Sequence, residues 1–137
     1  MMKLITKDTD YAIRALSYLS LYPERIVTVA QLSRELDIPQ PFLRRILQRL
    51  SAAGVLRSQK GKQGGFRLAR LPDTIQLQEV IRIFQGPLTL MECLKNPKTC
   101  VNSSTCPLHR KMKEIQQDLR KKLDGITVAS LSGKGAA

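Results

Sequence analysis

Two adjacent stretches of the chain are patterned as helices and are separated by very few residues. Thr28 and Gln31 have the spacing of a capping box, which predicts a short helix running to about Leu36. Residues 37–41 hold two prolines and predict a turn with proline at the start of the next helix. Apolar residues then recur on one face of that second helix, at Phe42, Leu43, Ile46, Leu47 and Leu50. The pattern predicts a helix-turn-helix.

A glycine-rich hairpin is predicted directly after the second helix. Gly54 suits the C-terminal cap of that helix. Residues 55–58 and 66–69 are patterned as short strands, and residues 60–65, with three glycines, predict the hairpin tip. A helix-turn-helix followed by a hairpin is a winged helix-turn-helix. The expected fold class is therefore mostly α with a small β-wing.

Further helices are predicted on both sides of this unit. Residues 9–22 have helical spacing and are followed by Pro23, and residues 77–84 precede Gly86-Pro87. A long charged helix begins at Pro107, and its apolar residues are Leu108, Met112, Ile115, Leu119 and Leu123. One narrow apolar stripe on a charged helix needs a partner, and a dimer interface is favoured over docking on the same chain.

The distribution of charge points to an anionic partner. The formal net charge is +12, which favours nucleic acid first and an anionic membrane surface second. Residues 38–72 contain eight Lys or Arg and no Asp or Glu, whereas solvated faces normally mix both signs. The same segment lacks the large apolar face with Trp or Phe anchors that membrane binding needs. Double-stranded DNA is the predicted partner, and no membrane is expected.

The second helix of a helix-turn-helix is the one that enters the major groove. Its arginines can donate to guanine or clamp phosphate, and both roles remain open for each. A glutamine at its start can read adenine or bond a phosphate, and lysines at the wing tip can reach the minor groove or a phosphate. The predicted DNA contacts are Gln40, Arg44, Arg45, Arg49, Lys60, Gly61 and Lys62.

All three cysteines and the one histidine lie within a short segment, spaced C-x6-C-x5-C-x2-H, at Cys93, Cys100, Cys106 and His109. Thiolates and imidazole suit zinc or an iron–sulfur cluster. Structural zinc sites usually show C-x2-4-C pairs, so the wider gaps here fit a larger group better. Cys106 and His109 share a face at the start of the long helix. The Asn- and Pro-rich residues 91–106 are expected to lack regular structure.

These patterns divide the chain into four parts. The expected parts are a DNA-binding domain at 1–88, a cysteine-rich loop at 89–106, a dimerisation helix at 107–125 and a C-terminal segment at 126–137, whose residues 132–137 are expected to be disordered. No signal peptide or membrane span is recognisable, so a cytoplasmic protein with reduced thiols is expected. No set of nucleophile, base and orienting residue emerges, so the chain is not expected to be an enzyme.

Several segments together resemble the winged-helix iron–sulfur transcriptional regulators, the family of IscR and NsrR. They are Thr9–Leu16, Ile38–Leu50, Gly54–Leu56, the glycines and Phe66-Arg67-Leu68 of the wing, the three cysteines, and Ile126–Val128. The resemblance implies a homodimeric regulator of a palindromic operator, with crossed long helices at the interface. It also implies a cluster held by Cys93, Cys100 and Cys106.

The fourth ligand follows from the same resemblance. The step from Cys106 to His109 is similar to the IscR-like pattern, in which histidine completes a [2Fe–2S] site. In NsrR-like members a carboxylate of the other subunit's first helix serves a [4Fe–4S] cluster, and Asp10 is the matching position. The hypothesis is a repressor whose operator affinity is controlled by a cluster, [2Fe–2S] favoured and [4Fe–4S] the alternative, sensing redox state, nitric oxide or iron status. A zinc-stabilised or metal-free thiol-switch DNA-binding protein is the alternative.

Overall fold

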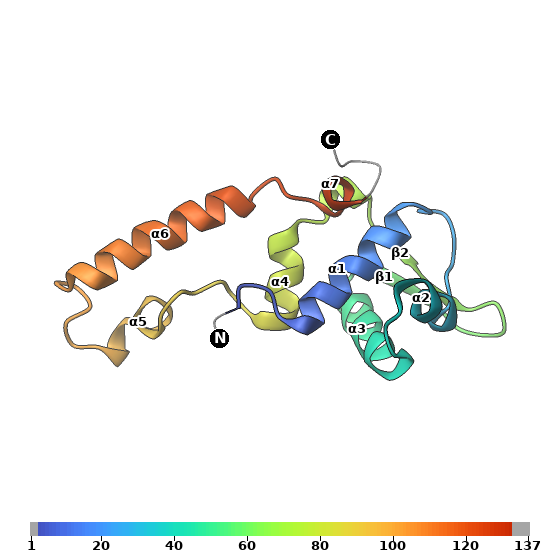
Figure 1. Cartoon of the computed structure of the whole chain (residues 1–137), viewed down its shortest axis with the longest axis horizontal. Helices are drawn as coiled ribbons and strands as arrows, with labels where there is room; N and C mark the ends of the chain where they lie inside the picture. The colour runs from blue at the N-terminus through green and yellow to red at the C-terminus, as the bar shows by residue number, and fades with distance from the viewer. Residues whose placement is uncertain (1–2, 133–137) are drawn as a thin grey trace.

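The computed structural model describes residues 3–132 and has two parts, a head and a projecting arm (Figure 1). The head is residues 3–85 together with 126–132, and the arm is residues 91–123. A linker, residues 86–90, leads from the head to the arm, and residues 124–125 lead back to the head. The elements in chain order are α1 (Lys7–Ser20), α2 (Val29–Leu36), α3 (Gln40–Ala52), β1 (Leu56–Gln59), β2 (Gly65–Leu68), η1 (Pro72–Thr74), α4 (Leu77–Gln85), α5 (Glu92–Lys95), η2 (Pro97–Thr99), α6 (Pro107–Leu123) and α7 (Val128–Leu131).

The predicted helix-turn-helix is confirmed as α2 and α3. The Gln31 amide donates to Thr28 Oγ1 at 3.1 Å, and the Thr28 amide donates to Gln31 Oε1 at 2.9 Å, so the capping box is complete. Asp37 ends α2 in the left-handed conformation, with φ of 55°. The chain thereby reverses within three residues before α3 begins.

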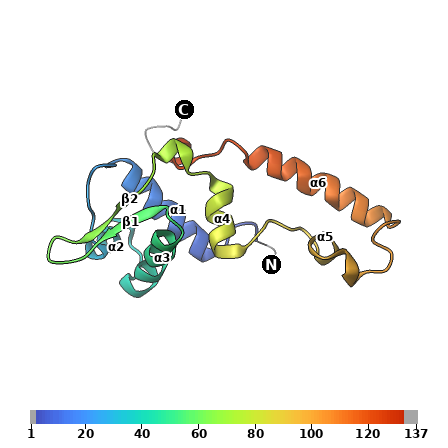
Figure 2. The same cartoon turned by 180° about the vertical axis from the view of Figure 1, so that it is seen from behind.

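The predicted wing is confirmed as an antiparallel pair with β1 and β2 in the register Leu56↔Leu68 to Gln59↔Gly65. Each strand lies one residue from its predicted position. The wing is anchored to the head by a bridge between Val27 and Phe66. A Cβ at Gly65 would lie 2.5 Å from the Val27 carbonyl oxygen, so this close approach requires glycine. Figure 2 shows the hairpin extending from the head on the side away from the arm.

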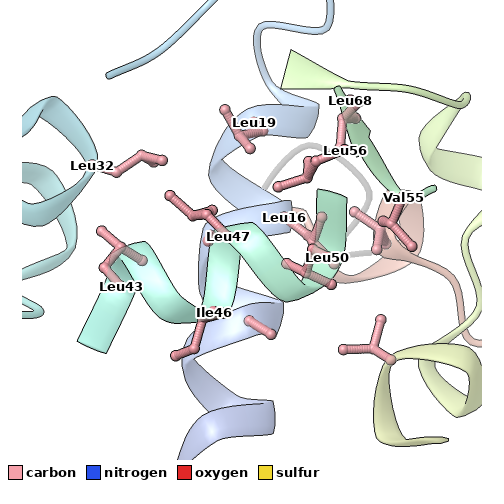
Figure 3. Packing of buried hydrophobic residues seen from close by; sticks show 14 of the residues in the cluster. Leu16, Leu19, Leu32, Leu43, Ile46, Leu47, Leu50, Val55, Leu56 and Leu68 are labelled. Atoms are coloured by element: carbon pink, nitrogen blue, oxygen red, sulfur yellow. The ribbon is translucent and has the colours of Figure 1, made fainter. Parts of the chain in front are cut away.

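The core of the head lies between α3, α1 and the wing base (Figure 3). The predicted stripe of α3 is buried at Leu43, Ile46, Leu47 and Leu50, each 0% exposed. Phe42, the first residue of that predicted stripe, remains 46% exposed. Burial of each leucine contributes about 1.5–3 kcal/mol. The orientation of α3 is therefore fixed by one apolar face, which leaves the opposite face to solvent.

The arm carries α6, which the sequence predicts as the dimerisation helix (Figure 1). The helix is tied to the linker by two side chains: Gln116 Oε1 accepts from the Leu90 amide at 2.8 Å, and Arg120 donates to the Leu88 carbonyl at 2.7 Å. Part of the apolar stripe remains open, with Leu108 58% and Ile115 52% exposed. The role of this stripe as a dimer seam stays a prediction.

The expectation that residues 91–106 lack regular structure is wrong. They contain α5 and η2. Cys93 of α5 is 7% exposed because this single helical turn packs against α6. Asn96 does end α5, and its side chain then accepts from the Lys98 amide at 3.2 Å to start η2.

The segment after α6 returns to the head and forms α7, a helix that the sequence does not predict. The Leu77 amide donates to the Ile126 carbonyl at 2.8 Å, and the Val128 amide donates to the Ile75 carbonyl at 2.9 Å. Ser132, placed in the predicted tail, is 6% exposed. The rest of that predicted tail, residues 133–137, lies outside the described residues. Between residues 3 and 132, no helix is both long and apolar enough to cross a membrane.

Candidate nucleic-acid interface and cysteine site

The exposed face of α3 carries the residues predicted to contact DNA. Gln40 is exposed at the first position of the helix. Arg44 is exposed one turn later, and no hydrogen bond or ion pair of its side chain is recorded within residues 3–132. Gln48, four residues after Arg44, is exposed on the same face. It was missed by sequence reasoning, although the i, i+4 relation to Arg44 could have identified it.

Arg45 lies on the same helix but is held by the head. Its Nη2 donates to both oxygens of the Asp8 carboxylate, at 3.1 and 3.3 Å. Its guanidinium also lies 5.5 Å from the centroid of the Phe42 ring. The side chain of Arg45 remains 53% exposed. It is therefore positioned by α1 while still being open to a partner.

Arg49, also predicted to contact DNA, is directed against α4. Its Nη2 donates to the Ile83 carbonyl at 2.6 Å, and its guanidinium lies 4.7 Å from the centroid of the Phe84 ring. Carbonyls in the last turn of a helix lack helical partners, so Arg49 caps α4 from the side. This arrangement links α3 to the end of α4.

The wing tip exposes the other predicted contacts, Lys60, Gly61 and Lys62. Gly61 has φ of 108°, a conformation that favours glycine, and its carbonyl accepts from the Gly64 amide at 3.0 Å. The tip is therefore a tight turn that carries two exposed lysines.

Arg70, one of the eight Lys and Arg residues within 38–72, has a structural partner. It donates to Glu79 of α4 at 2.6 Å and to the Thr74 carbonyl at 2.5 Å. The hydrogen bond to the Glu79 carboxylate, together with its charge, raises the pKa of Arg70, while partial desolvation opposes the shift. The positive surface is thus formed by fewer side chains than the sequence count suggests.

The last residue of α4, Gln85, holds the beginning of α1. Its Oε1 accepts from the Thr6 amide at 2.9 Å and from Thr9 Oγ1 at 2.6 Å. Its Nε2 donates to the Leu4 carbonyl at 2.9 Å. The end of α4 is therefore bonded to α1 through Gln85 and to α3 through Arg49, and it leads directly into the linker.

Two of the four predicted soft ligands are brought together. Cys93 Sγ lies 3.0 Å from His109 Nδ1, which joins α5 to α6. Cys106 is the N-cap residue of α6 and shares with His109 a cavity of about 220 Å³ that also contains Ser103 and Ser104. Cys100 follows η2 and is partly exposed.

The complete predicted ligand set is not assembled in this arrangement. In residues 3–132, no three His, Cys, Asp or Glu side chains form a group that could hold a metal ion. Asp10, the alternative fourth ligand, accepts instead from Arg14 at 3.2 Å on the outside of α1. The donors are chemically suited to iron–sulfur or zinc.

A winged helix-turn-helix head with a basic helix face and a basic wing tip defines a DNA-binding transcriptional regulator. Residues 5–134 match the model of one family, Rrf2, described as an iron-dependent transcriptional regulator. The chain belongs to the Rrf2 family. This confirms the resemblance found in the sequence and places the protein among transcriptional regulators rather than enzymes.

Individual relatives agree with this assignment. A protein of Aquifex aeolicus (strain VF5), named as an HTH-type transcriptional regulator, is 35% identical over 131 residues, which are 93% of this chain and 91% of that protein. CymR, the global cysteine regulator of B. subtilis, has a TM-score of 0.76 at 22% identity, with 98% of each chain covered. IscR of T. potens has a TM-score of 0.69 at 23% identity, covering 95% of this chain and 85% of that one. These two structures support the fold.

Proposed function

We propose that this protein is a homodimeric repressor whose affinity for a palindromic operator is controlled by an iron–sulfur cluster. The observation that carries the proposal is the contact between Cys93 and His109 on the arm, at 3.0 Å. The chain enters the arm from the end of α4, where α1 and α3 are both bonded, and Gln78 of α4 also donates to the Arg120 carbonyl of α6 at 3.0 Å. A ligand on the arm can therefore influence the helix that reads DNA.

The proposed cluster ligands are Cys93, Cys100, Cys106 and His109, with Asp10 of the other subunit as the alternative to the histidine. The chemistry of the donors fits a cluster because thiolates bind its irons and imidazole raises its potential. Cys106 and His109 already share one cavity, and Cys93 already contacts His109. When bound, the cluster supplies a group that changes charge or is lost under redox stress or nitric oxide. We favour [2Fe–2S] over [4Fe–4S] because histidine is within the site.

The proposed dimer interface is the exposed apolar stripe of α6. Leu108 and Ile115 are more than half exposed at 58% and 52%, which is unusual for large apolar residues repeated along one helix. Pairing with the same stripe of a second copy would bury them. The two α3 helices could then reach half-sites about one turn of DNA apart, roughly 34–36 Å.

Hydrogen bonds in the head and linker provide a route between the two sites. Gln116 and Arg120 of α6 hold the linker, and Gln85 and Arg49 bond the end of α4 to α1 and α3. Movement of residues 96–106 on cluster binding would shift the Cys93 turn against α6. The linker would transmit that shift to α4, and the orientation of α3 relative to DNA would change.

A metal-free thiol switch is the second candidate. The fold is also that of CymR, which is named a global cysteine regulator, and one structure of Staphylococcus aureus CymR is of an oxidized form. A thiol 3.0 Å from an imidazole nitrogen is also a suitable arrangement for a reactive thiolate. A zinc-stabilised module without sensing is the third interpretation of the same residues.

The deciding experiment is the content of iron, zinc and acid-labile sulfide per chain, together with a visible spectrum, on anaerobically purified protein. About two irons and two sulfides support [2Fe–2S] with His109, and about four of each support [4Fe–4S] with Asp10. Zinc without sulfide, or no metal, would contradict the cluster. Cys106→Ala should lose the iron and sulfide, whereas Ser104→Ala, in the same cavity, should keep both.

DNA binding is tested separately with Arg44→Ala/Arg45→Ala. The double variant should bind duplex DNA more weakly, with a salt dependence flattened by roughly 0.9 in log–log slope for each phosphate that the variant no longer neutralises. Fluorescence anisotropy at several salt concentrations gives both quantities. An unchanged binding curve and slope would refute the placement of α3 on DNA.

A further inference from the structure

One ion pair joins the proposed reading helix to α1. Asp8 lies in the first turn of α1 and accepts from Arg45 Nη2 with both carboxylate oxygens, at 3.1 and 3.3 Å. On its other side the Arg45 guanidinium faces the Phe42 ring, 5.5 Å from its centroid. The start of α1 is itself held by Gln85 through Thr9 Oγ1 at 2.6 Å. The backbone that carries Asp8 is therefore anchored to the end of α4.

The pair leaves Arg45 able to bind a base. A guanidinium has five N–H donors, and the recorded bonds use Nη2 alone. The two oxygens of one carboxylate lie in nearly the same direction from Nη2, so they share one of its two hydrogens. The other Nη2 hydrogen forms a fork with a hydrogen of either Nη1 or Nε, and that pair of donors stays open. That pair matches the O6 and N7 acceptors of guanine. The side chain is also 53% exposed, so these donors can be reached.

The neighbouring arginines of α3 lack this arrangement. Within the described residues Arg44 has no recorded polar partner, while Arg49 donates to the Ile83 carbonyl of α4 at 2.6 Å. Arg45 also lies in the N-terminal half of α3, the part of a reading helix that approaches base edges. Arg45 alone combines a fixed orientation with open donors.

We propose that Asp8 is a positioning residue that holds Arg45 for two-pronged recognition of a guanine in each half-site. The proposal rests on the proposed function, in which α3 enters the major groove. A held arginine loses less rotamer freedom on binding than a free one. The Asp8 carboxylate also repels phosphate, so it directs the guanidinium toward a base edge rather than the backbone. Asp8 therefore contributes sequence preference rather than general affinity.

The test begins with selection of bound sequences from a pool of random DNA duplexes by the full-length protein purified anaerobically. The same selection is made with Asp8→Asn, Arg45→Ala and Arg45→Lys. As a control, Asp73→Asn removes one negative charge at an exposed position in η1. Affinities are then measured for the selected duplex and for duplexes changed at one base pair in each half-site.

In Asp8→Asn, the preference for one guanine–cytosine pair per half-site should fall at least about fivefold. This value is the lower end of the discrimination that one two-pronged contact provides. Arg45→Ala should lose preference at the same pair. Arg45→Lys should also lose preference at this pair, because lysine lacks the planar fork, but it should keep most of the affinity. In the Arg45→Ala background, adding Asp8→Asn should change the preference no further. Asp73→Asn should select the wild-type sequence.

Two results would overturn the proposal. If Asp8→Asn selects the wild-type sequence with undiminished preference, Asp8 does not position Arg45. If Asp8→Asn binds every duplex more tightly than Asp73→Asn does, with the same preference, the carboxylate competes with DNA instead. A wild-type protein that enriches no sequence would overturn the proposed function as well, so the two failures are distinguishable.

Discussion

Replacing Arg49 with alanine separates its structural role from a role in DNA binding. The change removes a hydrogen bond of 2.6 Å to the Ile83 carbonyl and the interaction with the Phe84 ring, 4.7 Å from its centroid. A hydrogen bond to a charged group contributes about 1.5–3 kcal/mol, and an exposed cation–π interaction about 0.5–1 kcal/mol. Because Arg49 is solvent-exposed, solvent screening reduces these values. We expect the free energy of unfolding to fall by about 1–2 kcal/mol.

The assay is urea and thermal unfolding followed by circular dichroism, at one fixed protein concentration because a dimer's stability depends on concentration. The melting temperature should fall by about 3–8 °C. Arg44→Ala is the matched control, since it removes the same charge from the same helix without a recorded partner. It should leave stability within about 0.5 kcal/mol of wild type and should flatten the salt dependence of DNA binding.

The opposite pattern would refute this reasoning. If Arg49→Ala leaves the unfolding curve unchanged and lowers the salt slope by about one, Arg49 contacts a phosphate, which is one of the two roles that the sequence leaves open for it. The bond to α4 would then be too weak to link α3 to the linker, and the proposed route between arm and head would lose one of its two connections.

Three further changes test the interface, the wing and the core. Ile115→Lys should convert the dimer to a monomer in sedimentation analysis, whereas Gln117→Lys, exposed elsewhere on α6, should not; a dimer in both variants would place the interface elsewhere. Gly65→Ala should destabilise the fold by about 1–3 kcal/mol in urea, because its Cβ would lie 2.5 Å from the Val27 carbonyl oxygen, and unchanged stability would mean that this close approach relaxes. Leu47→Ala, at a position 0% exposed, should cost about 2–5 kcal/mol, and a change under about 1 kcal/mol would show that the core readily collapses around the cavity.

The parts of the fold that the sequence predicts are those specified by local signals. The capping box at Thr28, the prolines at the start of α3 and the glycines of the wing act within a few residues of their own positions, and the elements lie within one or two residues of prediction. The helix α7 carries no comparable signal. Its burial depends on Ile75 and Leu77, which are about 50 residues away along the chain. Long-range packing of this kind cannot be inferred from spacing.

The sequence predicts those features of the candidate cysteine site that depend on residue type and spacing. Spacing alone indicates that Cys106 and His109 share one face of α6, and the structure places them on one cavity. The contact between Cys93 and His109 depends on the docking of α5 against α6, a turn that the sequence does not predict. Cys100, which follows η2, and Asp10, which pairs with Arg14 on α1, form no metal-holding group with this pair in the described part of the chain.

The different roles of the arginines of α3 follow from their positions around the helix and from the elements that pack beside it. At about 100° per residue, Arg49 lies only about 40° around the helix from Arg45, while Arg44 lies about 100° away from Arg45. Arg45 and Arg49 therefore face the side where α1 and α4 pack, and each finds a partner there. Gln85 bonds α4 to α1, so the supports of both arginines move with the end of α4. A change in the arm that shifts the linker would therefore alter the orientation of Arg45 through its support on α1, in addition to any movement that α3 makes as a whole. Such a change would affect sequence preference more than general affinity for DNA.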